Sequence, residues 1–182
     1  MNYAKVVDGV LQEYPYSKKH LIRDNPNISF AVHMSPEDLI SWGLYVVHPS
    51  PYAEFNPLTH RLTETNPVFD GEKWVQQWSI EVLSTEENAA KISEAKERIG
   101  IQAQQRLDNF AKTRGYDNIV TACTYASSQN TTYQTEGQRC VDLRDAVWAA
   151  LSTIFAAVDA KQREMVSNIH ELDAELPELT WD

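Results

Sequence analysis

Residues 114–158 read RGYDNIVTACTYASSQNTTYQTEGQRCVDLRDAVWAALSTIFAAV and decide the helical part of the fold. In the second half of this stretch, apolar residues recur at spacings of three and four, which places them on one face of an α-helix. That face comprises Cys140, Leu143, Val147, Leu151, Ile154 and Val158. Trp148, Phe155 and neighbouring alanines widen it, so we expect a buried helix from about Tyr133 to about Glu164. Trp148 and Leu151 are expected in its core.

A second long helix is predicted upstream, from about Thr85 to about Lys112. Ser84 and Glu87 form a capping box, in which each side chain satisfies a free backbone amide of the other residue. The apolar stripe of this helix is Ala89, Ile92, Ala95, Ile99, Ala103, Leu107 and Phe110. Gly115 ends the helix, and Asp117 is expected to cap a short helix from Asn118 to about Ser127.

The stripe is narrow and rich in alanine, while the rest of the helix is charged or polar. Such a pattern indicates that one side is solvated or faces a partner. We expect a partner or oligomer interface at Ile92 and Ala95 and on the neighbouring strand that carries Trp74 and Trp78. The alternative is an ordinary antiparallel hairpin with the last helix, particularly from Ile99 onward.

The front of the chain is predicted to be antiparallel β-structure. Asp8-Gly9 favours a tight turn between two strands within Tyr3–Tyr14. Residues 14–30, YPYSKKHLIRDNPNISF, are expected to form a turn-rich connector, and Ser35-Pro36 begins a short helix that ends at Gly43. Further strands are expected at Leu44–Val47 and, after the turn at Asp70-Gly71, at Trp74–Val82.

The periodicity changes from two to 3.6 residues at Ser84. We therefore predict an α+β chain with a β-rich region at 1–83 and a helical region at 84–182. The final residues, ELDAELPELTWD, are expected to form an extended acidic segment whose Leu176, Leu179 and Trp181 can dock on the helices.

Composition excludes several classes of function. The chain has 182 residues, 42% of them hydrophobic and 23% charged, which is typical of a globular protein. Its net charge of −10 argues against binding to nucleic acid or to an anionic membrane. We find no apolar run long enough to span a bilayer. Two cysteines do not make a disulfide framework, so synthesis in a reducing cytoplasm is expected.

No motif points to an enzyme. The histidines lack the spacing of a metal site, and we expect no cofactor or metal. Cys123 and Cys140 are expected to be buried structural thiols. The charged cluster of Arg139, Asp142, Arg144 and Asp145 could hold a catalytic carboxylate pair, but an ion-pair network is favoured. Trp74 and Trp78 are better explained by packing than by a sugar-binding platform.

Residues 106–158 resemble a module found near the C-terminus of small tail proteins of tailed bacteriophages. The matching residues are Arg114-Gly115-Tyr116-Asp117, Thr124-Tyr125, Glu136-Gly137 and Arg144-Asp145-Ala146-Val147-Trp148. Looser similarity is present in the front of the chain. The pattern contains no catalytic residues, so the resemblance implies a non-enzymatic protein. It also suggests that Arg144 and Asp145 tie the last helix to the turn at Arg114–Asp117.

The resemblance implies a structural component of a phage tail, baseplate or tail-fibre attachment region. Its partners would be tail, baseplate or fibre proteins, and it would be a homo-oligomer or present in several copies. It would be made in the host cytoplasm and located in the virion. The alternative is a tail-fibre assembly chaperone that is not retained in the particle.

Overall fold

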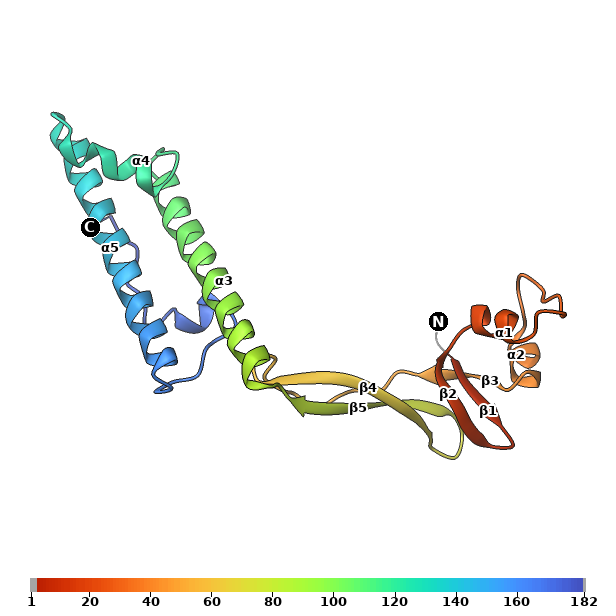
Figure 1. The fold of residues 1–182 in the computed structure, drawn as a ribbon. Coiled ribbons are helices and arrows are strands. Elements are labelled where there is room, and N and C mark those ends of the chain that lie inside the picture. The colour runs from red at the N-terminus through yellow and green to blue at the C-terminus, as the bar shows by residue number, and fades with distance from the viewer. Residues whose placement is uncertain (1–2, 182) are drawn as a thin grey trace. The chain divides into compact units, whose positions relative to one another are not determined.

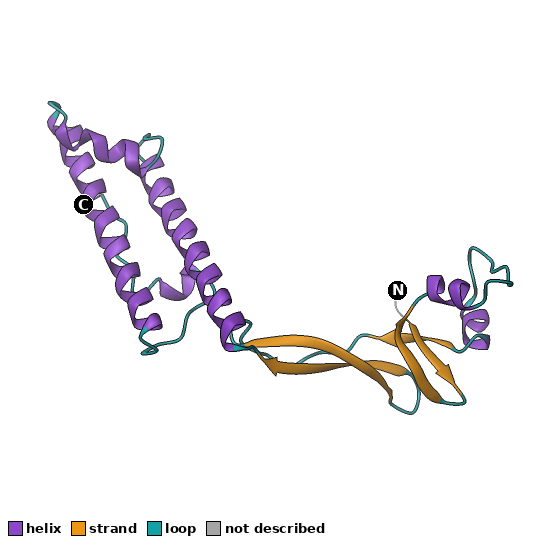
Figure 2. Cartoon of the chain, viewed as in Figure 1, coloured by secondary structure: helices purple, strands orange, loops and turns teal. Residues whose placement is uncertain are grey.

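The computed structural model describes residues 3–181, and the chain divides into two compact units, Met1–Val82 and Leu83–Asp182 (Figure 1). The fold is α+β, with all five strands in the first unit and the long helices in the second. Figure 2 shows this division of strands and helices. The predicted class is therefore confirmed.

The first unit is built on a mixed five-stranded sheet of order β2-β1-β3-β5-β4. The strands are β1 (Tyr3–Val7), β2 (Val10–Tyr16), β3 (Leu44–His48), β4 (His60–Phe69) and β5 (Trp74–Val82). All neighbours are antiparallel except β3 and β5, which are parallel. Asp8 and Gly9 both have positive φ angles, as the predicted β1–β2 turn requires.

Two short helices join β2 to β3. Helix α2 (Pro36–Ser41) begins at the predicted cap Ser35. Gly43 then allows close packing, because a Cβ there would stand 2.3 Å from the Val6 carbonyl oxygen. Helix α1 (Lys18–Asp24) lies where a turn-rich connector was predicted, so that prediction was wrong. Ser17 caps α1 in a capping box closed by His20 instead of the usual Glu or Gln.

The second unit consists of helices α3 (Thr85–Lys112), α4 (Ile119–Thr124) and α5 (Thr131–Asp159), with 3₁₀ turns at Tyr125–Ser127 and Ile169–Leu172. The bounds of α3 and its capping box agree with the prediction. Asn118, not Asp117, caps α4. Helix α5 begins two residues before the predicted start, capped by Asn130, and ends five residues early at Asp159.

The core of the second unit lies between α3, α4, α5 and the C-terminal segment, defined here as residues 160–181 (Figure 1). The predicted apolar residues of α5 are buried, as are those of α3 from Ala95 to Phe110. Buried residues of the C-terminal segment complete the core: Met165, Ile169, Leu172 and Leu176. The antiparallel-hairpin alternative therefore describes the greater part of α3.

Candidate interaction surfaces

The Arg114–Asp117 and Glu136-Gly137 parts of the phage-tail resemblance meet at one junction between α3, α4 and α5. Arg114 forms an ion pair with Glu136 at 2.8 Å, and the Tyr116 hydroxyl donates to the other oxygen of the same carboxylate at 2.7 Å. Burial, followed by the hydrogen bond to Glu136, raises the pKa of Tyr116 well above its usual range. The turn and the start of α5 are thus joined through Glu136.

Gly137, the next residue, lets the helices approach closely at this junction. A Cβ at this position would stand 2.3 Å from the Ala126 nitrogen and 2.5 Å from the Tyr125 carbonyl carbon. Real Cβ atoms do not come so close to backbone atoms, so a side chain here would force the 3₁₀ turn away from α5. The Glu136-Gly137 step of the motif therefore has a structural explanation: one residue bonds the turn, and the other makes room for it.

The C-terminal segment is clamped to α3 at the same end of the second unit. The Trp181 ring stacks on Phe110 with centroids 4.2 Å apart, and its indole nitrogen donates to the Thr113 hydroxyl at 2.9 Å. The guanidinium of Arg114 lies 5.2 Å from the same ring. The predicted docking of Leu176 and Trp181 is confirmed, and Leu179 is half-buried.

Arginines hold the main chain of this segment along its length. Arg98 donates to the Ser167 carbonyl at 3.1 Å, and Arg139 donates to the Thr180 carbonyl at 2.9 Å. Charged donors make stronger hydrogen bonds than neutral ones. The segment is therefore an integral part of the second unit.

Two predictions for α5 were wrong. Arg144 bonds its neighbour Asp145 at 2.9 Å, and neither reaches the Arg114–Asp117 turn, whose partner is Glu136. Trp148 is 37% exposed and lies against Gly100 at the edge of the α3–α5 contact. The physical reason is helical phase: Val147 and Leu151 take the core face, and Trp148 is turned about 100° from Val147. Leu151 is buried, as predicted.

The proposed interface on α3 and β5 must also be revised. Ala95 is fully buried inside the second unit, so it is not available to a partner. Trp74 packs in the core of the first unit with Ala4 and Val6. Ile92 and Trp78 are half-buried, and the Trp78 indole donates to the Ser50 carbonyl at 3.2 Å. Ile92 and Trp78 remain candidates, whereas Ala95 and Trp74 have internal roles.

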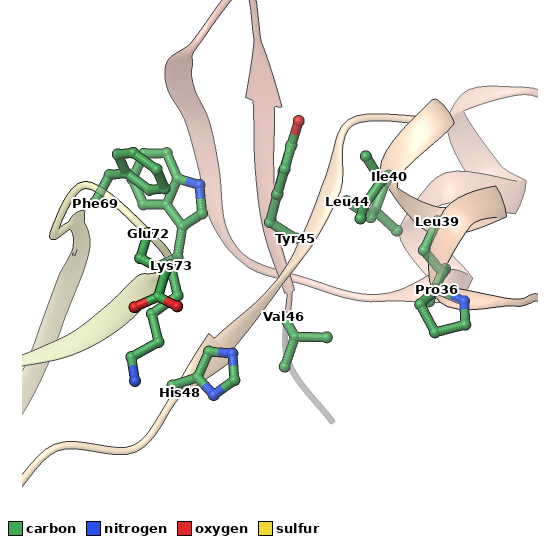
Figure 3. A pocket seen from close by; sticks show the side chains of 11 residues that line it. Pro36, Leu39, Ile40, Leu44, Tyr45, Val46, His48, Phe69, Glu72 and Lys73 are labelled. Atoms are coloured by element: carbon green, nitrogen blue, oxygen red, sulfur yellow. The ribbon is translucent and has the colours of Figure 1, made fainter.

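Sequence reasoning missed a groove in the first unit, which we call the β3 groove. It is a cavity of about 310 Å³ between α2, β3 and the β4–β5 turn (Figure 3). Its apolar wall includes Leu39, Ile40, Val46, Phe69 and Trp74, and its polar rim is formed by His48, Glu72 and Lys73. Within residues 3–181 these three polar side chains make no hydrogen bond or ion pair. Of the parts of this groove, the sequence predicted only the Asp70-Gly71 turn that joins β4 to β5.

The two cysteine thiols lie in surroundings that lower their reactivity. Burial raises the pKa of the Cys140 thiol to about 11 and also raises that of Cys123, so both are poor nucleophiles near neutral pH. Among residues 3–181 no cluster of three or more His, Cys, Asp or Glu side chains is arranged to hold a metal ion. None of the helices in the described part of the chain has the length and apolar character needed to cross a membrane.

Comparison of the chain with protein-family models, with curated proteins and with solved structures finds no match.

Proposed function

We propose that this protein is a non-enzymatic structural component of a bacteriophage tail, baseplate or tail-fibre attachment region. The observation that carries the proposal is the junction at Glu136. Arg114, Tyr116, Glu136 and Gly137 are four of the residues that match the phage tail module, and these four hold helices together. These matching residues therefore contribute packing and bonding between helices, which agrees with a resemblance that contains no catalytic residues.

The exposed surface supports a binding role. In the first unit, several large apolar side chains are exposed, among them Val68, Phe69, Ile40 and Val82. In the second unit, Ile101, Tyr125 and Tyr133 are exposed. Ile40 and Phe69 line the same groove, and the Tyr125 and Tyr133 rings contact each other. Exposed apolar groups that lie together are typical of sites that contact other proteins. We propose that these surfaces contact tail, baseplate or fibre proteins.

Quantitative mass spectrometry of purified phage particles tests the proposal. The expected result is that peptides from both units are present at a fixed copy number relative to the major tail protein. Preparations washed at high salt provide the control, because loosely adsorbed protein is removed by screening its charges. Presence in infected cells but absence from washed particles would overturn the proposal and support an assembly chaperone.

A further inference from the structure

We propose that the β3 groove binds an extended segment of a partner protein, which adds as a strand beside β3 and places an apolar side chain in the cavity and a carboxylate near Lys73 and His48. This inference rests on the proposed binding role for the expectation that a partner exists.

Strand β3 is paired along only part of one of its two edges. On one side, β1 pairs with Leu44, Tyr45 and Val46 of β3. On the other side, β5 pairs only with Val47 and His48. Across residues 3–181, no strand therefore lies beside the Leu44–Val46 part of that second edge. An open strand edge is a template for a strand from another chain.

The direction of the main-chain groups fits this use. The Val6 N–H donates to the Gly43 carbonyl at 2.8 Å, so Gly43 faces β1. Residues alternate in the edge that they present, so Tyr45 also faces β1, whereas Leu44 and Val46 face the open edge. A partner strand would find the N–H and C=O of Leu44 and the N–H of Val46 beside the cavity, because the parallel pairing of Val47 with Trp74 already uses the Val46 carbonyl.

The cavity of the β3 groove lies along the unpaired Leu44–Val46 edge of β3. Its volume of about 310 Å³ is at the lower end of the range for ligand pockets. Ile40 and Phe69 line it and are both 49% exposed, so apolar surface remains to be covered. Strand addition typically combines main-chain hydrogen bonds with a pocket for a side chain of the added strand.

Charged and polar side chains at the rim of the groove indicate the chemistry of the segment that it would bind. The Lys73 and His48 side chains stand at the rim and make no hydrogen bond or ion pair within residues 3–181, and the charge that acts on Lys73 there is the Asp70 carboxylate of the same turn. A carboxylate on the added strand would complement the Lys73 ammonium. Glu72, also at the rim, can accept from a main-chain or hydroxyl donor of the same segment. The occupant is therefore an extended segment that carries an apolar anchor and an acidic residue.

Peptide pools and the full-length chain test this inference. Each pool contains heptapeptides with blocked ends that are built from Thr and Val. Every peptide has Trp at its central position and one Asp, and the members of the pool differ in which of the other six positions the Asp occupies. Matched pools carry Lys in place of Asp. We expect the chain to bind the Asp pools at least tenfold more tightly than the Lys pools, and Lys73→Glu to reverse this preference.

Matched variants locate the binding. Ile40→Asp should weaken binding of the Asp pools at least tenfold, whereas Ile22→Asp, at an equally exposed isoleucine of α1 outside the groove, should not. Lys19→Glu, an exposed lysine of α1, is the charge control for Lys73→Glu. Circular dichroism establishes that each variant is folded.

Amide hydrogen exchange, measured by NMR, tests strand addition. The Leu44 and Val46 amides should become protected when an Asp pool binds. Binding without this protection would overturn strand addition, as would failure of every pool to bind. If the free chain self-associates and Ile40→Asp abolishes this self-association, the occupant of the groove is a second copy of the chain. That result would overturn the inferred partner. None of these results depends on whether the protein is found in particles, so this test and the test of the proposed function can fail separately.

Discussion

Gly137 and Gly100 both stand inside long helices, but their surroundings differ. A Cβ at Gly137 would collide with the backbone of residues 125–126, whereas a Cβ at Gly100 would meet the Trp148 ring at 3.8 Å, an ordinary contact. Gly137→Ala should therefore destabilise the second unit by about 1–3 kcal/mol through overpacking. Gly100→Ala should be neutral or stabilise it by up to about 1 kcal/mol, because alanine favours helix. Urea unfolding followed by helical circular dichroism measures both changes, and equal effects would contradict the proposed role of Gly137.

Two tyrosines of the first unit predict how its stability depends on pH. Burial, followed by hydrogen bonds to Glu64 and Asp24 respectively, raises the pKa of Tyr14 and of Tyr16 to about 12. The unfolded value is about 10, so the folded state holds these protons more tightly. The stability gained is present below about pH 10 and is lost as the pH rises towards about 12.

Alkaline unfolding checks this prediction. The free energy of unfolding of the first unit should fall between about pH 10 and 12, and Tyr14→Phe should make that fall shallower. Tyr52→Phe is the control, because Tyr52 is exposed and its hydroxyl makes no hydrogen bond within residues 3–181. A fall of unchanged slope in Tyr14→Phe would mean that the contact with Glu64 does not hold the Tyr14 proton.

Individual side chains were the least predictable feature. The spacing of apolar residues placed Leu151 correctly, because Leu151 lies at the centre of its stripe. Trp148 lies at the margin of the same stripe. Because the neighbouring alanines fit both a buried and an exposed surface, the sequence does not predict whether the Trp148 side chain faces the core or the solvent. The partner of Arg114 could not be chosen from sequence, because Glu136 and Asp145 are both acidic residues of α5 and only the three-dimensional fold distinguishes them.

The C-terminal segment acts as a third packing element beside α3 and α5. Leu172 is fully buried in it, so Leu172→Ala should cost about 2–5 kcal/mol of unfolding free energy for the second unit. Leu179→Ala, at a half-buried position of the same segment, should cost clearly less. Urea unfolding of the full chain distinguishes them. A loss below about 1 kcal/mol for Leu172→Ala would mean that the segment is a loose tail.

Local signals predicted most elements, and non-local pairing was missed. The capping box at Ser84, the cap at Ser35 and the turn at Asp8-Gly9 each act within a few residues, so the sequence shows them directly. Helix α1 was missed because His20 replaces the usual acidic or amide side chain of a capping box. The parallel β3–β5 pairing joins residues 27 positions apart, and neither it nor the open edge beside it leaves a periodic pattern.

The two units each have their own core, which predicts that the helical unit folds without the sheet. A fragment of residues 83–182 should show a strongly helical circular dichroism spectrum and unfold cooperatively. The matched fragment, residues 1–82, should give a spectrum dominated by β-structure. A largely unfolded 83–182 fragment would show that its stability depends on the first unit.

The proposed structural role in a phage particle is tested most directly by incorporation of variants. Phage carrying Ile40→Asp or Ile22→Asp in this chain would be purified, and the copy number of the protein would be measured by mass spectrometry. We predict that Ile22→Asp particles contain the wild-type copy number and that Ile40→Asp particles contain at least tenfold less, although both chains are folded and equally abundant in infected cells. Wild-type copy number for Ile40→Asp would contradict attachment through the β3 groove, and absence of even the wild-type chain from particles would contradict the structural role itself.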